Sequence, residues 1–251
     1  MLANSDLSLE PLKIAQLAQR AENEFVGARC GIMDQFAACH GRRGHALLLD
    51  CRSLEVEYVA VPEETSMVVC NTMVRHELAS GTYNERRRQC EEGVAVLAKF
   101  LPNVCALRDV RPDQLRMFAD KLDPVIFRRC RHVVQENNRV IEAAKSLQDK
   151  DVAAFGALMI ESHQSLRDDY EVSCPELDIM VELQLGAQGV YGARMTGGGF
   201  GGCTIALVNA RNVESLSRVV TERYREKTGI DCEVYVCSAA DAAGEVISPN
   251  A

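Results

Sequence analysis

The feature of the sequence that most restricts its fold is the glycine cluster at residues 195–203, MTGGGFGGC. Five of the six residues from 197 to 202 are glycine, namely Gly197, Gly198, Gly199, Gly201 and Gly202. Glycine adopts positive φ at no steric cost and lets a ligand or another backbone come into contact distance. A simple hairpin turn needs only about one or two glycines. This density therefore predicts a constrained loop at a binding site, beside a phosphate or a sugar.

The same cluster satisfies the spacing G-x-G-x-x-G at Gly197, Gly199 and Gly202. In a dinucleotide-binding fold this fingerprint opens a helix, whereas here the strand-like run CTIALV follows at once. The sequence also contains no G-x-x-x-x-G-K-[ST] phosphate loop. We therefore reject a dinucleotide-binding fold and interpret the cluster as a loop between two strands.

The first quarter of the chain predicts one helix and two strands. Residues 8–25 carry apolar side chains at helical spacing, with Ser8 placed to cap the start and Gly27 to end the helix. The apolar positions of this helix are Ile14, Leu17, Ala18, Ala21 and Phe25. Strand-like runs follow at residues 45–50 and 56–61. Pro62 and the polar residues after it mark a candidate domain boundary.

The remainder of the chain predicts a mixture of long helices and short strands. Expected helices cover residues 83–100, 125–147, 152–170, 176–185 and 213–227. Expected strands cover residues 67–70, 190–195, 203–208 and 232–237. The order strand, loop, strand, helix, strand near the end is typical of an antiparallel sheet with helices on one face. The predicted fold class is α+β.

Charge and composition exclude several classes of partner. The formal net charge is −8, which argues against nucleic acid or an anionic membrane surface. The one obvious basic cluster is Arg86 to Arg88, and glutamates follow Arg87 and Arg88 at i+4, so we interpret the cluster as a self-neutralised, solvated helix face. No run approaches the roughly 20 apolar residues of a membrane helix, and the start lacks a secretory signal pattern. We expect a cytoplasmic protein.

The cysteines and histidines do not predict a metal centre or a disulfide scaffold. The chain has eleven cysteines, an odd number without a C-x-x-C pair, and five histidines without a ligand-like pair. We expect the thiols to be reduced, and most of them to serve as small core residues.

Four stretches resemble galactokinases, a branch of the GHMP kinase family. MTGGGFGGC resembles the third signature motif of the family, and CGIMDQF at residues 30–36 resembles the segment that carries its catalytic aspartate. GHALLLDCRSLE at residues 44–55 and VRHELASGTYNERRRQCEE at residues 74–92 resemble galactokinases in particular. The four stretches occur in family order over most of the chain.

The resemblance implies a role for individual residues. Asp34 would face the anomeric hydroxyl of the sugar and take its proton, a role that phosphoryl transfer requires. Gly31 would contact the sugar ring through its main chain, Tyr83 would lie against the ring, and Arg75 would stand near the sugar. Glu22 would help to hold Mg²⁺. Taken without the resemblance, Asp34 reads as a helix cap, Glu22 as a solvated carboxylate and Arg75 as an ion-pair partner.

The implied architecture is a GHMP kinase-like α+β fold in two parts. Residues 1–62 would be a remnant of the N-terminal domain, and residues 63–251 a C-terminal domain with a ferredoxin-like layer. The implied reaction is ATP-dependent phosphorylation of galactose to galactose 1-phosphate, with ATP and Mg²⁺ as cofactors and a monomeric protein. Because the sugar motif at the start of family members and their P-x-G-x-G-L-S-S-S-A-type phosphate loop do not occur in these 251 residues, we expect this chain alone to be inactive.

Three alternatives remain open at this point. The parent protein could be an N-acetylgalactosamine kinase, a non-catalytic sugar sensor of the same family, or a truncated product without a function of its own. A sugar panel in an ADP-release assay separates the first two from a galactokinase.

Overall fold

The computed structural model of the chain describes residues 8–27, 30–75 and 79–244. The chain forms two compact units, and each is described by itself. Unit 1 comprises Met1–Glu63 with Ser238–Ala251, and unit 2 comprises Glu64–Cys237. The domain assignment made from the sequence, with its boundary after Pro62, stays a prediction.

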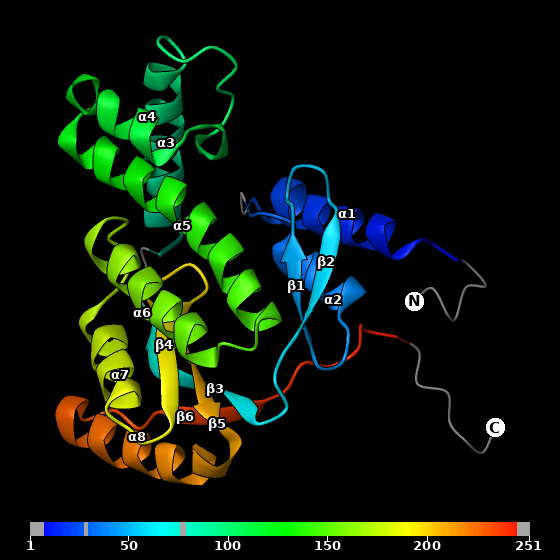
Figure 1. Cartoon of the computed structure of the whole chain (residues 1–251), viewed down its shortest axis with the longest axis vertical. Helices are drawn as coiled ribbons and strands as arrows, with labels where there is room; N and C mark the ends of the chain where they lie inside the picture. Colours follow the sequence, from blue (N-terminus) through cyan, green and yellow to red (C-terminus); the bar gives the residue numbers. More distant parts are fainter. Residues whose placement is uncertain (1–7, 28–29, 76–78, 245–251) are drawn as a thin grey trace. The chain divides into compact units, whose positions relative to one another are not determined.

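Unit 1 contains two helices, a π-helical turn and a two-stranded antiparallel sheet among its described residues. Its elements are α1 (Pro11–Ala21), the π-helix η2 (Glu22–Val26), α2 (Met33–His40), β1 (His45–Leu49) and β2 (Val56–Ala60) (Figure 1). The core of unit 1 is small: Ala15, Ile32 and Phe36 are buried, and apolar residues of α1, α2 and β1 pack around them. The two predicted strands and the turn between them are confirmed.

The first helix differs from its prediction in two respects. It begins at Pro11, after an N-cap residue Glu10 without a side-chain cap bond, so Ser8 is not the cap. Proline at N1 already has the helical φ, which starts the helix without a hydroxyl cap. Gly27 ends the element as predicted, with φ of 79°.

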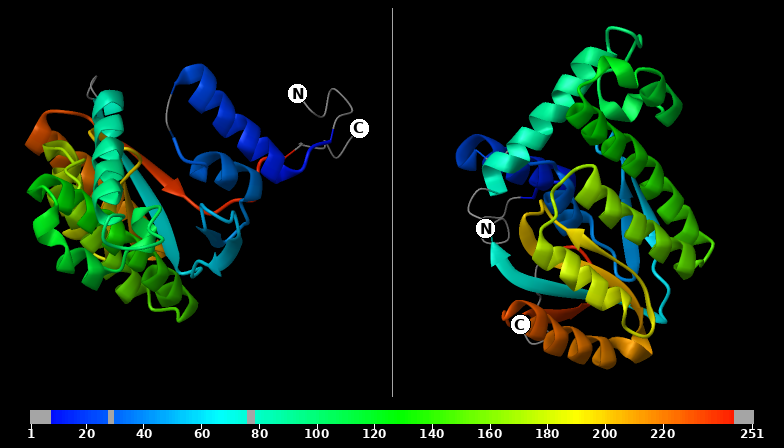
Figure 2. Two further views of the ribbon diagram at one scale, coloured as in Figure 1. Left: turned by 90° about the horizontal axis from the view of Figure 1, so that it is seen from above. Right: turned by 90° about the vertical axis from the view of Figure 1, so that its left-hand side faces the viewer.

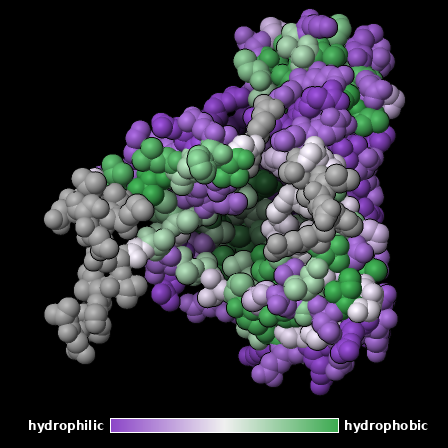
Figure 3. All heavy atoms as spheres, turned by 180° about the vertical axis from the view of Figure 1, so that it is seen from behind, coloured by the Kyte–Doolittle hydropathy of each residue, from purple (hydrophilic) through white to green (hydrophobic). Residues whose placement is uncertain are grey.

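The buried face of α1 is also not the predicted one. Ala15 is fully buried, whereas Leu17 and Phe25 are 41% and 92% exposed. The helix carries apolar residues on two faces, and α2 and the small sheet cover only the face with Ala15. Apolar side chains accordingly appear at the surface in the region of α1 (Figure 3).

Unit 2 is built on a four-stranded antiparallel sheet in the order β4-β5-β3-β6. The strands are β3 (Thr65–Arg75), β4 (Val190–Thr196), β5 (Gly201–Asn209) and β6 (Glu233–Cys237). The longer helices are α3 (Ala79–Leu97), α5 (Pro124–Gln148), α6 (Val152–Asp168), α7 (Pro175–Leu185) and α8 (Val213–Thr228). Short helical elements are η3 (Leu107–Asp109), α4 (Pro112–Met117), η4 (Ala119–Lys121) and η5 (Ala210–Asn212).

The helices of unit 2 lie on one side of this sheet, as the left view of Figure 2 shows. The main core joins buried side chains of α7 and α8 to the strands, including Met180, Leu216 and Tyr224 against Val68 and Ala206. A second core joins α3, α5 and the short helices between them. The predicted α+β class and the antiparallel sheet with helices on one face are confirmed.

Local signals explain where the long helices begin and end. The N-cap residues Asp123 and Asp151 accept hydrogen bonds from Val125 N and Ala154 N, at 2.8 and 2.9 Å. Gly229, with φ of 74°, ends α8. Strand β3 is longer than predicted and runs to Arg75, because pairing with β5 carries the strand past the apolar run.

Candidate functional site

The glycine cluster forms a loop between β4 and β5, as the sequence predicted. Gly197, Gly199 and Gly202 have φ of 80°, 85° and 83°, and even Phe200 has φ of 60°. Side chains disfavour this left-handed region, so the cluster is a constrained loop and not a flexible turn. Gly198 lacks a positive φ, and a Cβ built on it would meet only Tyr83 Cδ2, at 3.8 Å.

The two ends of the loop are fixed by buried polar groups. Thr72, fully buried on β3, donates its hydroxyl to the carbonyl of Gly202 at 2.7 Å. On the other side, the Met195 amide donates to Nδ1 of buried His163 at 3.3 Å, and Nε2 of that ring lies 3.3 Å from Asp178. Buried polar groups that bond to the backbone hold it in one arrangement.

The structure therefore brings two predicted site features of unit 2 together. Tyr83, 39% exposed in the first part of α3, stands beside the glycine loop at Gly198. Arg75 is the last residue of β3 and pairs in register with Gly201, while its side chain lies outside the described part of the structure. An accessible aromatic ring beside an open glycine backbone is a surface on which a sugar ring packs.

The other predicted site residues belong to unit 1. Asp34 lies in the first turn of α2 and is exposed. The N-cap residue is Ile32, without a side-chain cap bond, so the reading of Asp34 as a cap is wrong. A carboxylate in the first turn is favoured by the helix dipole. Among the described residues, none forms a hydrogen bond or ion pair with the Asp34 carboxylate, which leaves it available to a ligand hydroxyl.

Glu22 and Gly31 lie on either side of Cys30. Glu22 begins the π-helix, is exposed, and accepts a hydrogen bond from Cys30 Sγ at 3.3 Å. Burial and the nearby Glu22 carboxylate raise the pKa of the Cys30 thiol. Gly31 is exposed, and a Cβ built on it would meet no atom within 4 Å, so its main chain is open to a ligand.

A cavity of about 310 Å³ in unit 1 is separate from these residues. It is lined by α2, β1 and the returning end of the chain, through Met33, Phe36, Ala37, Gly41, Arg42, His45, Leu47, Leu49, Ala239 and Ala240. Asp34 and Gly31 are not among the lining residues. The lining is mostly apolar and carries no carboxylate, so it does not suit a sugar.

No three His, Cys, Asp or Glu side chains are grouped to hold a metal in the part of the chain that the structure describes. Mg²⁺ in kinases is bound by one or two carboxylates together with phosphate oxygens and waters. A single exposed carboxylate such as Glu22 fits that requirement, although it does not form a metal site without phosphate.

One group near the loop was missed by sequence reasoning. The contacts of Arg87 with Glu91 and of Arg88 with Glu92 are present at 3.1 and 3.0 Å, as predicted. Arg86, in contrast, is half-buried and donates to the carbonyls of Tyr170 and Glu171, so its reading as part of a solvated face is wrong. A signal existed: Arg86 has no acidic residue at i+4, and it lies one turn after Tyr83.

Comparison with known proteins identifies the family. The family model for the N-terminal domain of GHMP kinases matches residues 1–42, and the model for the C-terminal domain of GHMP kinases matches residues 143–226. Galactokinase of Roseiflexus sp. (strain RS-1) is 46% identical over 235 residues, which cover 94% of this chain and 60% of that protein. Human galactokinase is 49% identical over 230 residues, which cover 91% of this chain and 56% of that protein.

A solved structure agrees with the sequence relatives. The crystal structure of Lactococcus lactis galactokinase complexed with galactose matches with a TM-score of 0.92 and 36% identity, over 96% of this chain and 63% of that one. The chain thus spans 56–60% of the length of these two curated relatives. The described residues contain no helix that is both long and apolar enough to cross a membrane. The chain therefore belongs to the GHMP kinase family and, within that family, to the galactokinases.

Proposed function

We propose that the protein to which this chain belongs transfers the γ-phosphoryl group of ATP to the C1 hydroxyl of galactose. The observation that carries the proposal is the identity of 46–49% to galactokinases over more than nine-tenths of the chain, joined to an exposed and unpartnered Asp34 among the described residues. The galactose complex of the Lactococcus lactis relative supports the choice of sugar. We also propose the predicted division into an N-terminal and a C-terminal kinase domain, and a monomer in the cytoplasm. The eleven cysteines form no disulfide in the described structure, which suits a reducing compartment.

In the proposed reaction Asp34 acts on the acceptor. Its carboxylate accepts the proton of the C1 hydroxyl while the C1 oxygen forms a bond to the γ-phosphorus and the bond from that phosphorus to the bridging oxygen of ADP breaks. Gly31 and Tyr83 would position the sugar, the first through its main chain and the second through its ring. Arg75 would stand near the sugar, and the glycine loop would border the ligand.

Mg²⁺ would neutralise phosphate charge when bound with ATP, and Glu22 is the residue proposed to hold it. Removal of a single preorganised donor at such a site lowers rates by about a hundredfold or more. We therefore expect the loss of Glu22 to lower the rate of phosphoryl transfer measurably.

The proposal is tested by assaying ADP release with ATP, Mg²⁺ and galactose, using both the 251-residue chain and a version extended to the length of its relatives. We expect turnover in the extended version and none in the short chain. N-acetylgalactosamine as the preferred substrate would contradict the proposed sugar, and sugar binding without ADP release would indicate a sensor.

The role of Asp34 is tested separately in the extended version. We expect Asp34→Asn to lower kcat by at least about a hundredfold without unfolding the protein, because the amide cannot accept the hydroxyl proton. Asp113→Asn is the matched control, since Asp113 is also an exposed residue in the first turn of a short helix, and among the described residues its carboxylate pairs with Arg111. Equal turnover of the two variants would refute the assignment of Asp34.

A further inference from the structure

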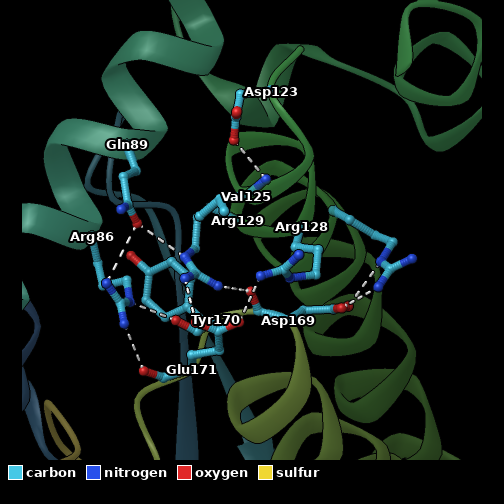
Figure 4. A network of polar contacts seen from close by, with 10 residues as sticks. Arg86, Gln89, Asp123, Val125, Arg128, Arg129, Asp169, Tyr170 and Glu171 are labelled. Carbon is cyan, nitrogen blue, oxygen red and sulfur yellow. Dashed lines mark hydrogen bonds and ion pairs between the residues drawn. The ribbon is translucent and has the colours of Figure 1, made fainter. Parts of the chain in front are cut away.

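The chain leaves α6 through a short connection, residues 169–172, whose backbone is held by two arginines. Arg129 of α5 donates from Nη1 to the carbonyl of Asp169 at 2.5 Å. Arg86 of α3 donates from Nε to the carbonyl of Tyr170 at 2.7 Å and from Nη2 to that of Glu171 at 2.9 Å. Figure 4 shows the two guanidinium groups reaching the same stretch from different helices. Three successive carbonyls are thus fixed by side chains.

The charge of Arg129 is compensated inside the unit. Its side chain is only 2% exposed, and it also donates to Glu171 Oε2 at 2.6 Å and to Gln89 Oε1 at 3.0 Å. The Arg129 guanidinium lowers the pKa of the Glu171 carboxyl to about 2, with help from Arg128. A buried charge is tolerated only when it is paired and hydrogen-bonded, and here the bonds to Asp169 and Glu171 also hold the connection in place.

The connection in turn supports the glycine loop. Glu171 has φ of 54°, a conformation that a residue with a side chain keeps only when its surroundings enforce it. The next residue, Val172, accepts a hydrogen bond from the Phe200 amide at 2.7 Å. Gly199 is pressed so closely against the Val172 carbonyl that an added Cβ would lie 2.1 Å from its oxygen. The conformation of the loop therefore depends on where residues 169–172 stand.

Arg86 also connects the loop with the aromatic residue beside it. Its guanidinium lies 6.0 Å from the centre of the Phe200 ring, within the loop. Tyr83, which faces Gly198, is three residues earlier on the same helix, and side chains three apart share a helix face. Arg86 thus contacts the loop and, through residues 170 and 171, the support of the loop.

We propose that Arg86 is a positioning residue, which holds the glycine loop against Tyr83 by fixing the backbone of residues 170 and 171. The effect on the conformation of the loop follows from the contacts of unit 2 alone. The effect on turnover rests on the function proposed above, because it requires the loop and Tyr83 to border the sugar.

Amide hydrogen exchange of the 251-residue chain tests the first effect. We expect Arg86→Gln to accelerate exchange at the amides of residues 199–202 by about tenfold or more. The paired amides of β3 and of residues 203–209 of β5 should change little, because the loop opens locally without global unfolding of the unit. Arg87→Gln is the matched control on the same helix, where Arg87 is exposed and pairs with Glu91. We expect no change at the loop in this control.

Two further results complete the test. Arg86→Lys keeps the positive charge, but its single ammonium group lacks the planar guanidinium that donates to both carbonyls. We therefore expect an exchange rate at the loop between those of the unmutated chain and Arg86→Gln. This variant replaces Arg86→Gln in the test if Arg86→Gln fails to fold. In the extended version we expect Arg86→Gln to lower kcat/KM for galactose at least about tenfold, and Arg87→Gln to leave it within about twofold.

Two outcomes would overturn the proposal, and a third would refute only the proposed function. Unchanged exchange at the loop in both Arg86 variants would show that Arg86 does not position it, and equal acceleration throughout unit 2 would show a purely structural role. A tenfold change in exchange without turnover in the unmutated extended version would leave the positioning role intact and refute the proposed function instead.

Discussion

Replacement of Gly199 by alanine measures how closely the glycine loop is packed. An ideal Cβ at this position lies 2.1 Å from the Val172 oxygen, 2.9 Å from Val172 Cβ and 3.0 Å from Met195 Cε. The methionine end can move, but the Val172 carbonyl is backbone and holds the Phe200 amide at 2.7 Å. Overpacking of this kind costs about 1–3 kcal/mol, and a positive φ costs alanine about 1–2 kcal/mol more. We expect Gly199→Ala to lower the free energy of unfolding of unit 2 by about 2–5 kcal/mol.

The neighbouring glycines supply graded controls. Gly197 has φ of 80° but open space around it, so Gly197→Ala should cost only the conformational part, about 1–2 kcal/mol. Gly198 has ordinary φ and a contact at 3.8 Å, so Gly198→Ala should stay within about 0.5 kcal/mol. Urea unfolding followed by circular dichroism is suitable, because the chain has no tryptophan for fluorescence. Equal stability of the Gly199 and Gly198 variants would refute the close approach of the two backbones.

Three other variants test the interior of unit 2. Burial lowers the pKa of His132 to about 4, below its unfolded value, so the fold is stabilised while the imidazole is neutral, above pH 6.5. This contribution of about 3 kcal/mol is lost as the pH falls from 6.5 to about 4. His132→Gln should therefore make the melting temperature depend less on pH over that window. Gly156→Ala should destabilise the chain in urea by several kcal/mol, about 3, because its Cβ would lie 2.1 Å from the Tyr191 oxygen. Arg129→Met should lower the free energy of unfolding by about 3 kcal/mol in the same assay, because it leaves several hydrogen-bonding partners of Arg129 unbonded. If Glu171→Gln then costs less in the Arg129→Met background than in the unmutated chain, the two residues are coupled.

Much of the fold of unit 2 follows from sequence patterns. Apolar periodicity located its long helices, because each buries one stripe against the sheet or against a neighbouring helix. The cap residues Asp123 and Asp151 and the glycine at residue 229 set helix ends that agree with local rules. The prediction for the buried face of the first helix was wrong, because this helix carries apolar residues on two faces and periodicity does not say which of the two is buried.

The candidate site was only partly predictable. The glycine loop was located because glycine density reports backbone conformation directly, and the φ values of Gly197, Gly199 and Gly202 lie where glycine is unstrained. The resemblance supplied Asp34, Tyr83 and Glu22, and geometry adds that Asp34 is exposed and that Tyr83 faces the loop. The support beneath the loop was not predictable, because residues 169–172 carry no motif and are held through their backbone carbonyls.

Arg86 and Arg87 show why the support was missed. Both are arginines of one helix, and charge spacing along that helix describes Arg87 correctly, since Glu91 lies four residues on and bonds to it at 3.1 Å. For Arg86 the partners are carbonyls more than eighty residues away, at Tyr170 and Glu171. Every residue has a carbonyl, so no residue type at the partner position records the contact. Helix phase does record it, because Arg86 shares a face with Tyr83 and Gln89, and an arginine on the buried face of a helix must find acceptors inside the fold. The helix face on which a charged residue lies is therefore a better guide to its role than its neighbours in the sequence.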